Sequence, residues 1–335
     1  MKFHRKSSLL ACASMILLPS AAFADEGTTD EEPGVWRLGA GVNYSEGDYG
    51  DPQKTTVVSA PVSLRYRKGG FNFRVSVPFV SIDGPGSLLD TPQGRDAGFG
   101  DSGGDSGGDD NGGDSSGSNS GSGSSGSNSG SGSSGSNSGS GSSGSGSSGS
   151  GGGSDDGGST STGGDVVPVA GAAPSRRSGI GDVSISLGYS VPLGSATWFD
   201  VTGRVKLPTA STAKRLGTGK VDFTVGGDLV QDIGDLSLYA GGRYRFLGKP
   251  AGSTLRNTWG AGAGASYRLP GGTYVGADYG WQESATPGRG PSSEVTGWIN
   301  FGVSKRLRMQ VFASTGFNAN SADFAGGLSL SYRLN

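Results

Sequence analysis

Charged side chains recur at every second position of several short segments, as in Arg204 and Lys206 or Arg243 and Arg245. This spacing places both members of a pair on one face of a β-strand. A guanidinium group binds carboxylates through paired hydrogen bonds, and it also stacks on aromatic rings. These residues therefore suit a surface that attracts anionic or aromatic solutes.

The charged set on this alternating face contains eleven bases and six acids. An excess of bases favours a pore wall with a mild preference for anions. The alternative is a ladder of arginine–carboxylate pairs between strands, which would hold the wall together and narrow the bore. Both interpretations stay open from the sequence. The set comprises Arg37, Arg65, Arg67, Arg74, Arg204, Lys206, Arg243, Arg245, Arg268, Arg308 and Arg333 with Asp182, Asp200, Asp222, Asp228, Asp278 and Glu294.

Side chains for nucleophilic or metal chemistry are scarce. The sole histidine, His4, and the sole cysteine, Cys12, both lie near the N-terminus. If export removes that end, the mature chain has no Cys nucleophile, His base, zinc site or disulfide. The Ser–His chemistry of twelve-stranded outer-membrane phospholipases is excluded for the same reason. We therefore predict no enzyme activity, and no cofactor is implied.

Two glycine-containing stretches resemble nucleotide-binding motifs but do not satisfy them. A phosphate loop at Gly219–Lys220 fails because its first glycine and its final Ser or Thr are missing. Gly260, Gly262 and Gly264 alternate within a strand and lack the strand–turn–helix setting of a dinucleotide fingerprint. We interpret these three glycines as gaps that leave bore space or as sites of sheet curvature.

The first 24 residues have the organisation of an export signal. Basic residues precede an apolar segment at 9–18, and Ala22, Phe23 and Ala24 form a small-x-small cleavage site. A competing lipid attachment at Cys12 is disfavoured, because only about three apolar residues precede that cysteine. No later stretch reaches the roughly 18–20 apolar residues of a membrane helix. A membrane role must therefore use strands.

Apolar and polar residues alternate with period two from residue 35 onward, which is typical of strands with two unlike faces. Trp36, Leu38 and Val42, for example, share one face, and Arg37 and Asn43 share the other. The pattern predicts twelve strands. They cover 36–45, 58–67, 71–79, 183–191 and 199–207, and seven more are centred near residues 226, 242, 263, 277, 300, 311 and 329.

Short turns rich in Gly, Pro or Asp alternate along the chain with mostly longer connections. Aromatic residues gather at both ends of the segments, where membrane barrels place their interface girdles. An even strand number, alternating loop lengths and segments of about ten residues predict an all-β, twelve-stranded antiparallel transmembrane barrel of the bacterial outer membrane. A soluble all-β secreted protein is the alternative. The polar face must then line the lumen, since lipid offers no partner for arginine.

A low-complexity segment separates the third and fourth predicted strands. Residues 115–141 contain three copies of one nonapeptide built from Ser, Gly and Asn. The period matches calcium-binding β-rolls, but the repeats lack both the Asp ligands and the apolar residue of a roll. We therefore expect a solvated loop outside the cell. The predicted domains are a signal peptide at 1–24, an acidic segment at 25–34 and a barrel at 35–335, interrupted by the extracellular loop at 83–177.

Four short motifs follow one another in the second half of the chain: Gly179–Asp182, Lys206–Ala210, Leu216–Asp222 and Arg245–Pro250. Through them, residues 178–335 resemble the outer-membrane transporters named for the meta-pathway of phenol degradation. The resemblance implies passage of small compounds, aromatic ones among them, across the outer membrane. The long Gly/Ser insertion departs from the compact pattern of that family.

The stretch from Lys206 to Lys220 spans the outer end of one predicted strand, a loop and the start of the next. It is expected to form a rigid rim at the pore mouth, and the alternative is a well-formed turn with no solute contact. Its candidate residues are Pro208, Thr209, Gly217, Thr218, Gly219 and Lys220. The candidate pore-lining residues are Arg65, Arg74, Asp182, Arg204, Lys206, Asp222, Asp228, Arg243, Arg245, Arg268, Asp278 and Arg308.

Without the export signal and the acids of residues 96–165, 24 bases and 20 acids remain, with no basic cluster of the kind that binds nucleic acid. The expected partners are outer-membrane lipid and small-molecule solutes, and the oligomeric state stays open. We therefore predict a porin-like channel for passive uptake of small solutes, aromatic or anionic compounds among them. The alternative is a surface adhesin or receptor with the barrel as its anchor and the Gly/Ser-rich loop exposed.

Overall fold

The computed structural model describes residues 33–90, 165–167 and 175–335. The predicted export signal and most of the low-complexity segment lie outside these residues. None of the described residues belongs to a helix that is long and apolar enough to cross a membrane.

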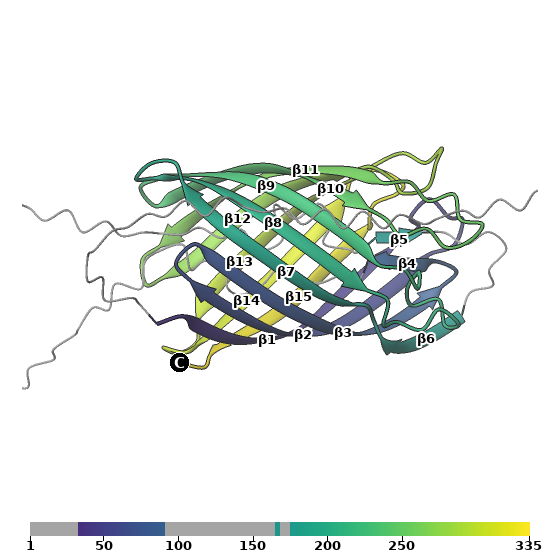
Figure 1. Ribbon diagram of the computed structural model, residues 1–335, viewed down its shortest axis with the longest axis horizontal. Coiled ribbons are helices and arrows are strands. Elements are labelled where there is room, and N and C mark those ends of the chain that lie inside the picture. The colour runs from purple at the N-terminus through teal and green to yellow at the C-terminus, as the bar shows by residue number, and fades with distance from the viewer. Residues whose placement is uncertain (1–32, 91–164, 168–174) are drawn as a thin grey trace, which may run out of the picture. The chain divides into compact units, whose positions relative to one another are not determined.

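Twelve antiparallel strands close into a barrel (Figure 1). Pairing runs from β2 through β1 and β15 around the wall to β7 and β3, and the pairing of β2 with β3 completes the ring. Each predicted segment corresponds to one wall strand, so the predicted fold class is confirmed. The wall strands are β1 (Val35–Gly47), β2 (Thr55–Lys68), β3 (Phe71–Gly84), β7 (Val183–Pro192), β8 (Thr197–Leu207), β9 (Asp222–Ile233), β10 (Leu236–Phe246), β11 (Thr258–Leu269), β12 (Thr273–Gln282), β13 (Ser292–Gly302), β14 (Leu307–Gly316) and β15 (Phe324–Arg333).

The alternation of each wall strand separates an outer apolar face from an inner polar one. Leu38, Val62 and Val201 point outward and are 46%, 52% and 48% exposed, whereas Asn43 and Ser63 point inward and are buried. A soluble protein shows the opposite distribution, because water favours polar surface. The outer face is therefore the one that suits lipid.

Aromatic side chains at both ends of the strands also face outward. This arrangement matches the interface girdles expected from the sequence. Tyr66 is half-buried because its ring lies 4.8 Å from that of Trp36 on the neighbouring strand. The exposed members are Trp36, Phe71, Tyr189, Tyr267 and Tyr332 at the end with short turns and Tyr44, Phe79, Phe246, Trp259 and Phe324 at the other end.

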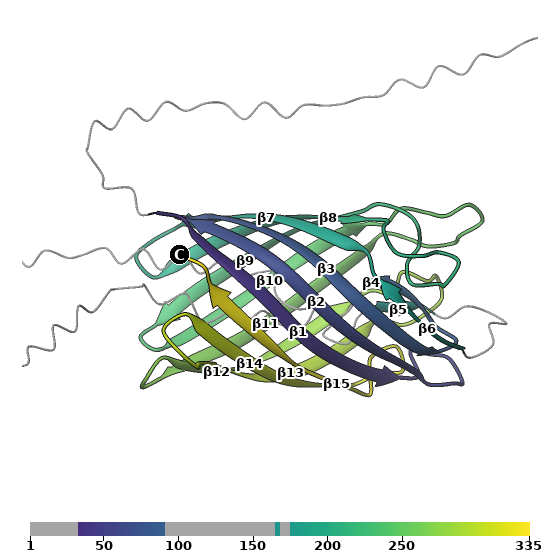
Figure 2. The same cartoon turned by 90° about the horizontal axis from the view of Figure 1, so that it is seen from below.

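Short turns join β2 to β3, β7 to β8, β9 to β10, β11 to β12 and β13 to β14, all at one end of the barrel (Figure 2). The side chain of Asn335 closes the seam between β15 and β1 at this end. Trp36 N donates to Asn335 Oδ1 at 2.8 Å, and Asn335 Nδ2 donates to the Gly34 carbonyl at 2.7 Å. We call this end the turn end and the opposite end the loop end.

A bulge interrupts the strand that follows the low-complexity segment. β6 (Ser175–Ile180) and β7 both pair with β3, but their registers differ by one residue across Gly181 and Asp182. A one-residue shift exchanges the two faces of a strand. Arg177 of β6 and Asp182 are consequently both buried, although their positions differ in parity.

Two short strands, β4 (Ser87–Asp90) and β5 (Asp165–Val167), form a separate antiparallel pair at the loop end (Figures 1 and 2). Leu88 and Leu89 of β4 are each 1% exposed, and Leu88 shares an apolar cluster with Ile82 of the wall and Leu216. The predicted loop at 83–177 therefore begins with residues packed into the barrel mouth instead of extending into solvent.

The turn from β3 into β4 depends on Gly84, whose φ is +138°. A Cβ atom there would lie 2.7 Å from the carbonyl oxygen of Lys54, so no larger residue fits. Arg177 fixes the turn by donating to the carbonyls of Gly84, at 2.7 Å, and of Gly86. These contacts direct β4 into the mouth.

Candidate functional site

The inner face of the barrel carries the charged residues expected from the sequence. Arg204, Arg243 and Arg308 are half-buried, and Arg268 is exposed at the turn end. Most of the inward charged side chains are buried. The buried charged members are Arg65, Arg74, Asp182, Asp200, Lys206, Asp222, Asp228, Arg245, Asp278 and Glu294.

Arginines occupy successive cross-strand positions around much of the wall. Arg333 faces Arg37, Arg37 faces Arg65, and Arg65 faces Arg74. The same row continues through Ser186 to Arg204 and through Thr224 to Arg245 on β7 to β10. We call this set the arginine row: Arg333, Arg37, Arg65, Arg74, Arg204 and Arg245.

The arginine row extends along the barrel axis from the turn end to the loop end. Arg37 and Arg333 lie at the turn end, and Arg204 and Arg245 lie near the loop ends of β8 and β10. A row perpendicular to tilted strands must rise along the barrel axis. The row therefore runs between the two mouths, with guanidinium groups on β15, β1, β2, β3, β8 and β10. Where two arginines face each other directly, their Cβ atoms lie about 5 Å apart.

Acidic residues occupy a different row. Asp200 faces Asp228, and the row then passes through glycines on β10, β11 and β12 to Glu294. On β8 this row lies four residues from the arginine row, which is roughly 13 Å along a strand. The register therefore separates bases from acids over much of the wall, and a simple alternating ladder is not formed there.

Ion pairing does hold the wall at the loop end. Lys206 Nζ lies 2.5 Å from Asp222 Oδ2 and 3.3 Å from Asp182 Oδ2, and all three residues are buried. Lys206 and Asp222 are direct cross-strand partners. The alternative interpretation of a structural ladder thus applies to this cluster.

Two predicted pore residues, Arg268 and Arg308, contact the turns at the turn end. Arg308 donates to Asn300 Oδ1 and to the Gly272 carbonyl, both at 3.0 Å. Arg268 forms an exposed ion pair with Asp235 at 3.0 Å. Both side chains are thus bonded to groups of adjacent strands and turns.

Aromatic side chains also enter the interior, a feature that the sequence analysis did not identify. Trp198, Tyr239, Trp298 and Phe312 are inward-facing and at most 7% exposed. Asp278 links two of them, because it accepts hydrogen bonds from the Tyr239 hydroxyl and, at 3.1 Å, from Trp298 Nε1. Their position on the polar parity of their strands was the signal that could have revealed them.

Gly264, one of the three glycines that alternate on β11, faces this aromatic group. The sequence left two interpretations open, bore space and sheet curvature. The first does not hold for Gly264, because the Tyr239 ring covers it, and an added Cβ would lie 2.6 Å from that ring. Gly276 accommodates Trp298 in the same way, at 2.4 Å. The gaps left by these two glycines are therefore filled by aromatic rings from adjacent strands.

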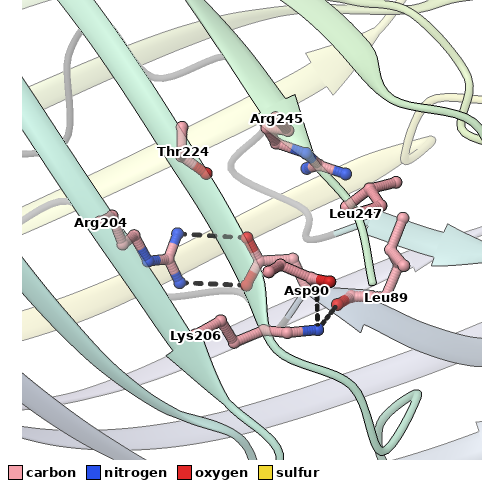
Figure 3. A pocket seen from close by; sticks show the side chains of 8 residues that line it. Leu89, Asp90, Arg204, Lys206, Thr224, Arg245 and Leu247 are labelled. Carbon is pink, nitrogen blue, oxygen red and sulfur yellow. Dashed lines mark hydrogen bonds and ion pairs between the residues drawn. The ribbon is translucent and has the colours of Figure 1, made fainter. Parts of the chain in front are cut away.

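A pocket at the loop end brings β4 against the arginine row (Figure 3). Arg204 binds Asp90 through two parallel hydrogen bonds, Nη1 to Oδ2 and Nη2 to Oδ1, each 3.1 Å long. Lys206 Nζ donates to the Leu89 carbonyl at 2.7 Å. The pocket is lined by Leu89, Asp90, Arg204, Lys206, Asp222, Thr224, Arg245 and Leu247.

The surroundings of Asp90 favour its ionised form. Burial opposes the charge, but the positive charges of Arg204, Arg245 and Lys206 outweigh burial and hold the pKa of the carboxyl below its ordinary value. The pocket therefore stabilises a carboxylate in its charged form.

The predicted rim folds around Asp182. Ala210 N donates to Asp182 Oδ1 at 2.9 Å, and an added Cβ on Gly217 would lie 2.6 Å from Asp182 Oδ2. Thr209 Oγ1 donates to the Gly181 carbonyl at 2.9 Å. Gly219 turns the chain with a φ of +68°. These residues form an ordered turn above the wall.

The remaining rim residues have varied exposure. Pro208 and Lys220 are exposed, and Thr218 is half-buried. None of the six predicted rim residues lines the pocket around Asp90. The rim and the pocket are joined through Lys206, which contacts both Asp182 and β4.

Among solved structures, the chain is similar to the COG4313 outer membrane channel from Pseudomonas putida F1. The TM-score is 0.54 at 12% identity, over 92% of this chain and 99% of that chain. The chain has the fold of an outer-membrane channel. At this identity the similarity concerns the fold alone.

Two further structures match less closely. The KdgM porin aligns with a TM-score of 0.44 at 7% identity, over 89% of this chain and 99% of that one. The CymD monoaromatic hydrocarbon channel aligns with a TM-score of 0.39 at 11% identity, over 90% and 88%. No protein-family profile and no curated protein sequence matches the chain.

Proposed function

We propose that this protein is an outer-membrane channel for the passive uptake of small carboxylated solutes, aromatic carboxylates among them. The proposal rests on the arginine row. The facing arginines Arg37, Arg65 and Arg74 concentrate positive charge along one path of the inner wall. Such a path suits a wall that meets mobile anions.

The interior aromatics support the same solute class. Arginine attracts both carboxylates and aromatic faces, and Trp198, Tyr239 and Trp298 offer ring surface inside the barrel. The resemblance to transporters of phenol degradation agrees with an aromatic solute. We also propose that residues 1–24 are removed on export and that the turn end faces the periplasm, as short turns do in outer-membrane barrels.

The experiment is a reversal-potential measurement on refolded protein in planar bilayers under a potassium chloride gradient. We expect the wild-type channel to prefer chloride over potassium. Replacing Arg65→Gln and Arg74→Gln together should lower that preference by roughly twofold or more, because potentials in low-dielectric clefts reach several kT.

Arg268→Gln is the matched control, since Arg268 is exposed, paired with Asp235 and outside the row. It should leave the reversal potential close to wild type. A wild-type channel that prefers potassium would overturn the proposal.

A further inference from the structure

The pocket around Asp90 has the chemistry of a solute-binding site. Two parallel hydrogen bonds from one guanidinium are the geometry by which arginine recognises a carboxylate. Arg204 makes this contact with Asp90, and Lys206 and Arg245 line the same pocket. Apart from Asp90, the only acid among its described lining residues is Asp222.

The residue that fills the pocket does not belong to the barrel wall. Asp90 ends β4, whose described sheet partner is the short strand β5. Arg204, Lys206 and Arg245, in contrast, project from wall strands with partners on both sides. Asp90 is thus held in place by far less backbone pairing than the three basic residues that it contacts or faces.

An apolar surface adjoins the charged one. Leu89 precedes Asp90 and packs with Leu247 and Ala285, and Leu255 packs against this group. β4 thus presents to the wall a carboxylate next to an apolar side chain. A small aromatic carboxylate likewise joins a carboxylate to an apolar group.

We infer that this pocket is a carboxylate-binding site at the loop end of the arginine row, which the chain's own Asp90 occupies and from which a solute displaces it. The solute carboxylate takes the place of Asp90 on Arg204, and its ring takes the place of Leu89 against Leu247. The inference rests on the proposed function, and it names the entry site of the channel.

Benzoate binding to refolded full-length barrel, measured by isothermal titration calorimetry, tests the inference. Asp90→Asn removes the internal competitor while keeping its size. It should tighten benzoate binding by roughly tenfold or more, because a tethered competitor acts at an effective concentration in the millimolar range. Adding Arg204→Gln to Asp90→Asn should abolish the gain.

Asp83→Asn is the matched control, because Asp83 is an exposed carboxylate at the end of β3 that does not line the pocket. It should bind benzoate as the wild type does. Equal benzoate affinity in Asp90→Asn and wild type would overturn the inference. The proposed function would still stand if the wild-type reversal potential favours chloride, so the two failures are distinguishable.

A second measurement avoids any change to the pocket. A nitroxide label on Ser87→Cys of β4 should gain mobility when benzoate is added, and it should not respond to benzyl alcohol, which lacks the carboxylate. An unchanged label at saturating benzoate would contradict displacement of β4.

Discussion

At the scale of single residues, Asp278 ties three strands together inside the barrel. It lies on β12 and accepts hydrogen bonds from Tyr239 on β10 and Trp298 on β13. A buried carboxyl group depends on such donors, because burying a polar group without hydrogen-bond partners costs free energy. The two aromatic residues therefore anchor the interior as well as fill it.

Tyr239→Phe removes one donor to Asp278 and keeps the ring over Gly264. We expect the free energy of unfolding to fall by about 1–3 kcal/mol, the cost of leaving a buried group without one partner. Urea unfolding in detergent micelles, followed by tryptophan fluorescence, measures the change.

Tyr244→Phe serves as the control on the outer face. Its ring contacts with Phe246 and Trp259, both at 4.7 Å between centroids, do not need the hydroxyl. Equal stability of the two variants would show that the Tyr239 hydroxyl contributes nothing to folding.

At the scale of elements, the sequence predicted the wall strands and their two faces, because period-two alternation is a local property. It did not predict the arginine row, since the register between strands depends on the tilt and stagger of the closed barrel. Nor did it predict β4. The available signal was the Leu88–Leu89 pair, two adjacent apolar residues inside an otherwise polar loop.

The interior aromatics were missed for a related reason. Trp198 and Trp298 lie on the parity that carries Asp200 and Glu294, whereas aromatic residues near strand ends are expected mainly in the girdles. The glycines that accommodate Tyr239 and Trp298 lie on other strands, so the fit between ring and gap appears only once the strands are paired.

Gly264→Ala tests this fit between elements. The new methyl group would lie 2.5 Å from Asp278 Oδ1 and 2.6 Å from the Tyr239 ring. We expect a loss of about 1–3 kcal/mol in unfolding free energy, as for other overpacked interiors. Urea titration of the refolded barrel gives the value.

Gly297→Ala is the corresponding control, because an added Cβ at Gly297 has no atom within 4 Å. It should fold with wild-type stability. A Gly264→Ala variant as stable as this control would mean that the ring moves aside without cost.

At the scale of the whole molecule, the barrel places polar side chains inside and apolar side chains outside. This inverted distribution makes the surrounding lipid part of what stabilises the fold. The loss of folding free energy on substitution should then depend on whether the side chain faces the hydrocarbon core of the bilayer.

Val201→Arg puts a charge at the middle of β8 on the outer face, where Val201 is 48% exposed. We expect it to lower folding stability in lipid vesicles by about 2–4 kcal/mol, the cost of arginine near the bilayer midplane. Leu193→Arg, in the turn between β7 and β8, should cost only about 0–1 kcal/mol. Similar costs at both positions would argue against a membrane-embedded outer face.

The pairing of β4 with β5 joins Asp90 to Asp165 across the sheet, although 74 residues separate them in the chain. Their backbones lie as near to each other as the two ends of a hairpin. Foreign peptides grafted between these positions would start and finish at one anchored point, so the barrel offers a scaffold for presenting epitopes at its loop end.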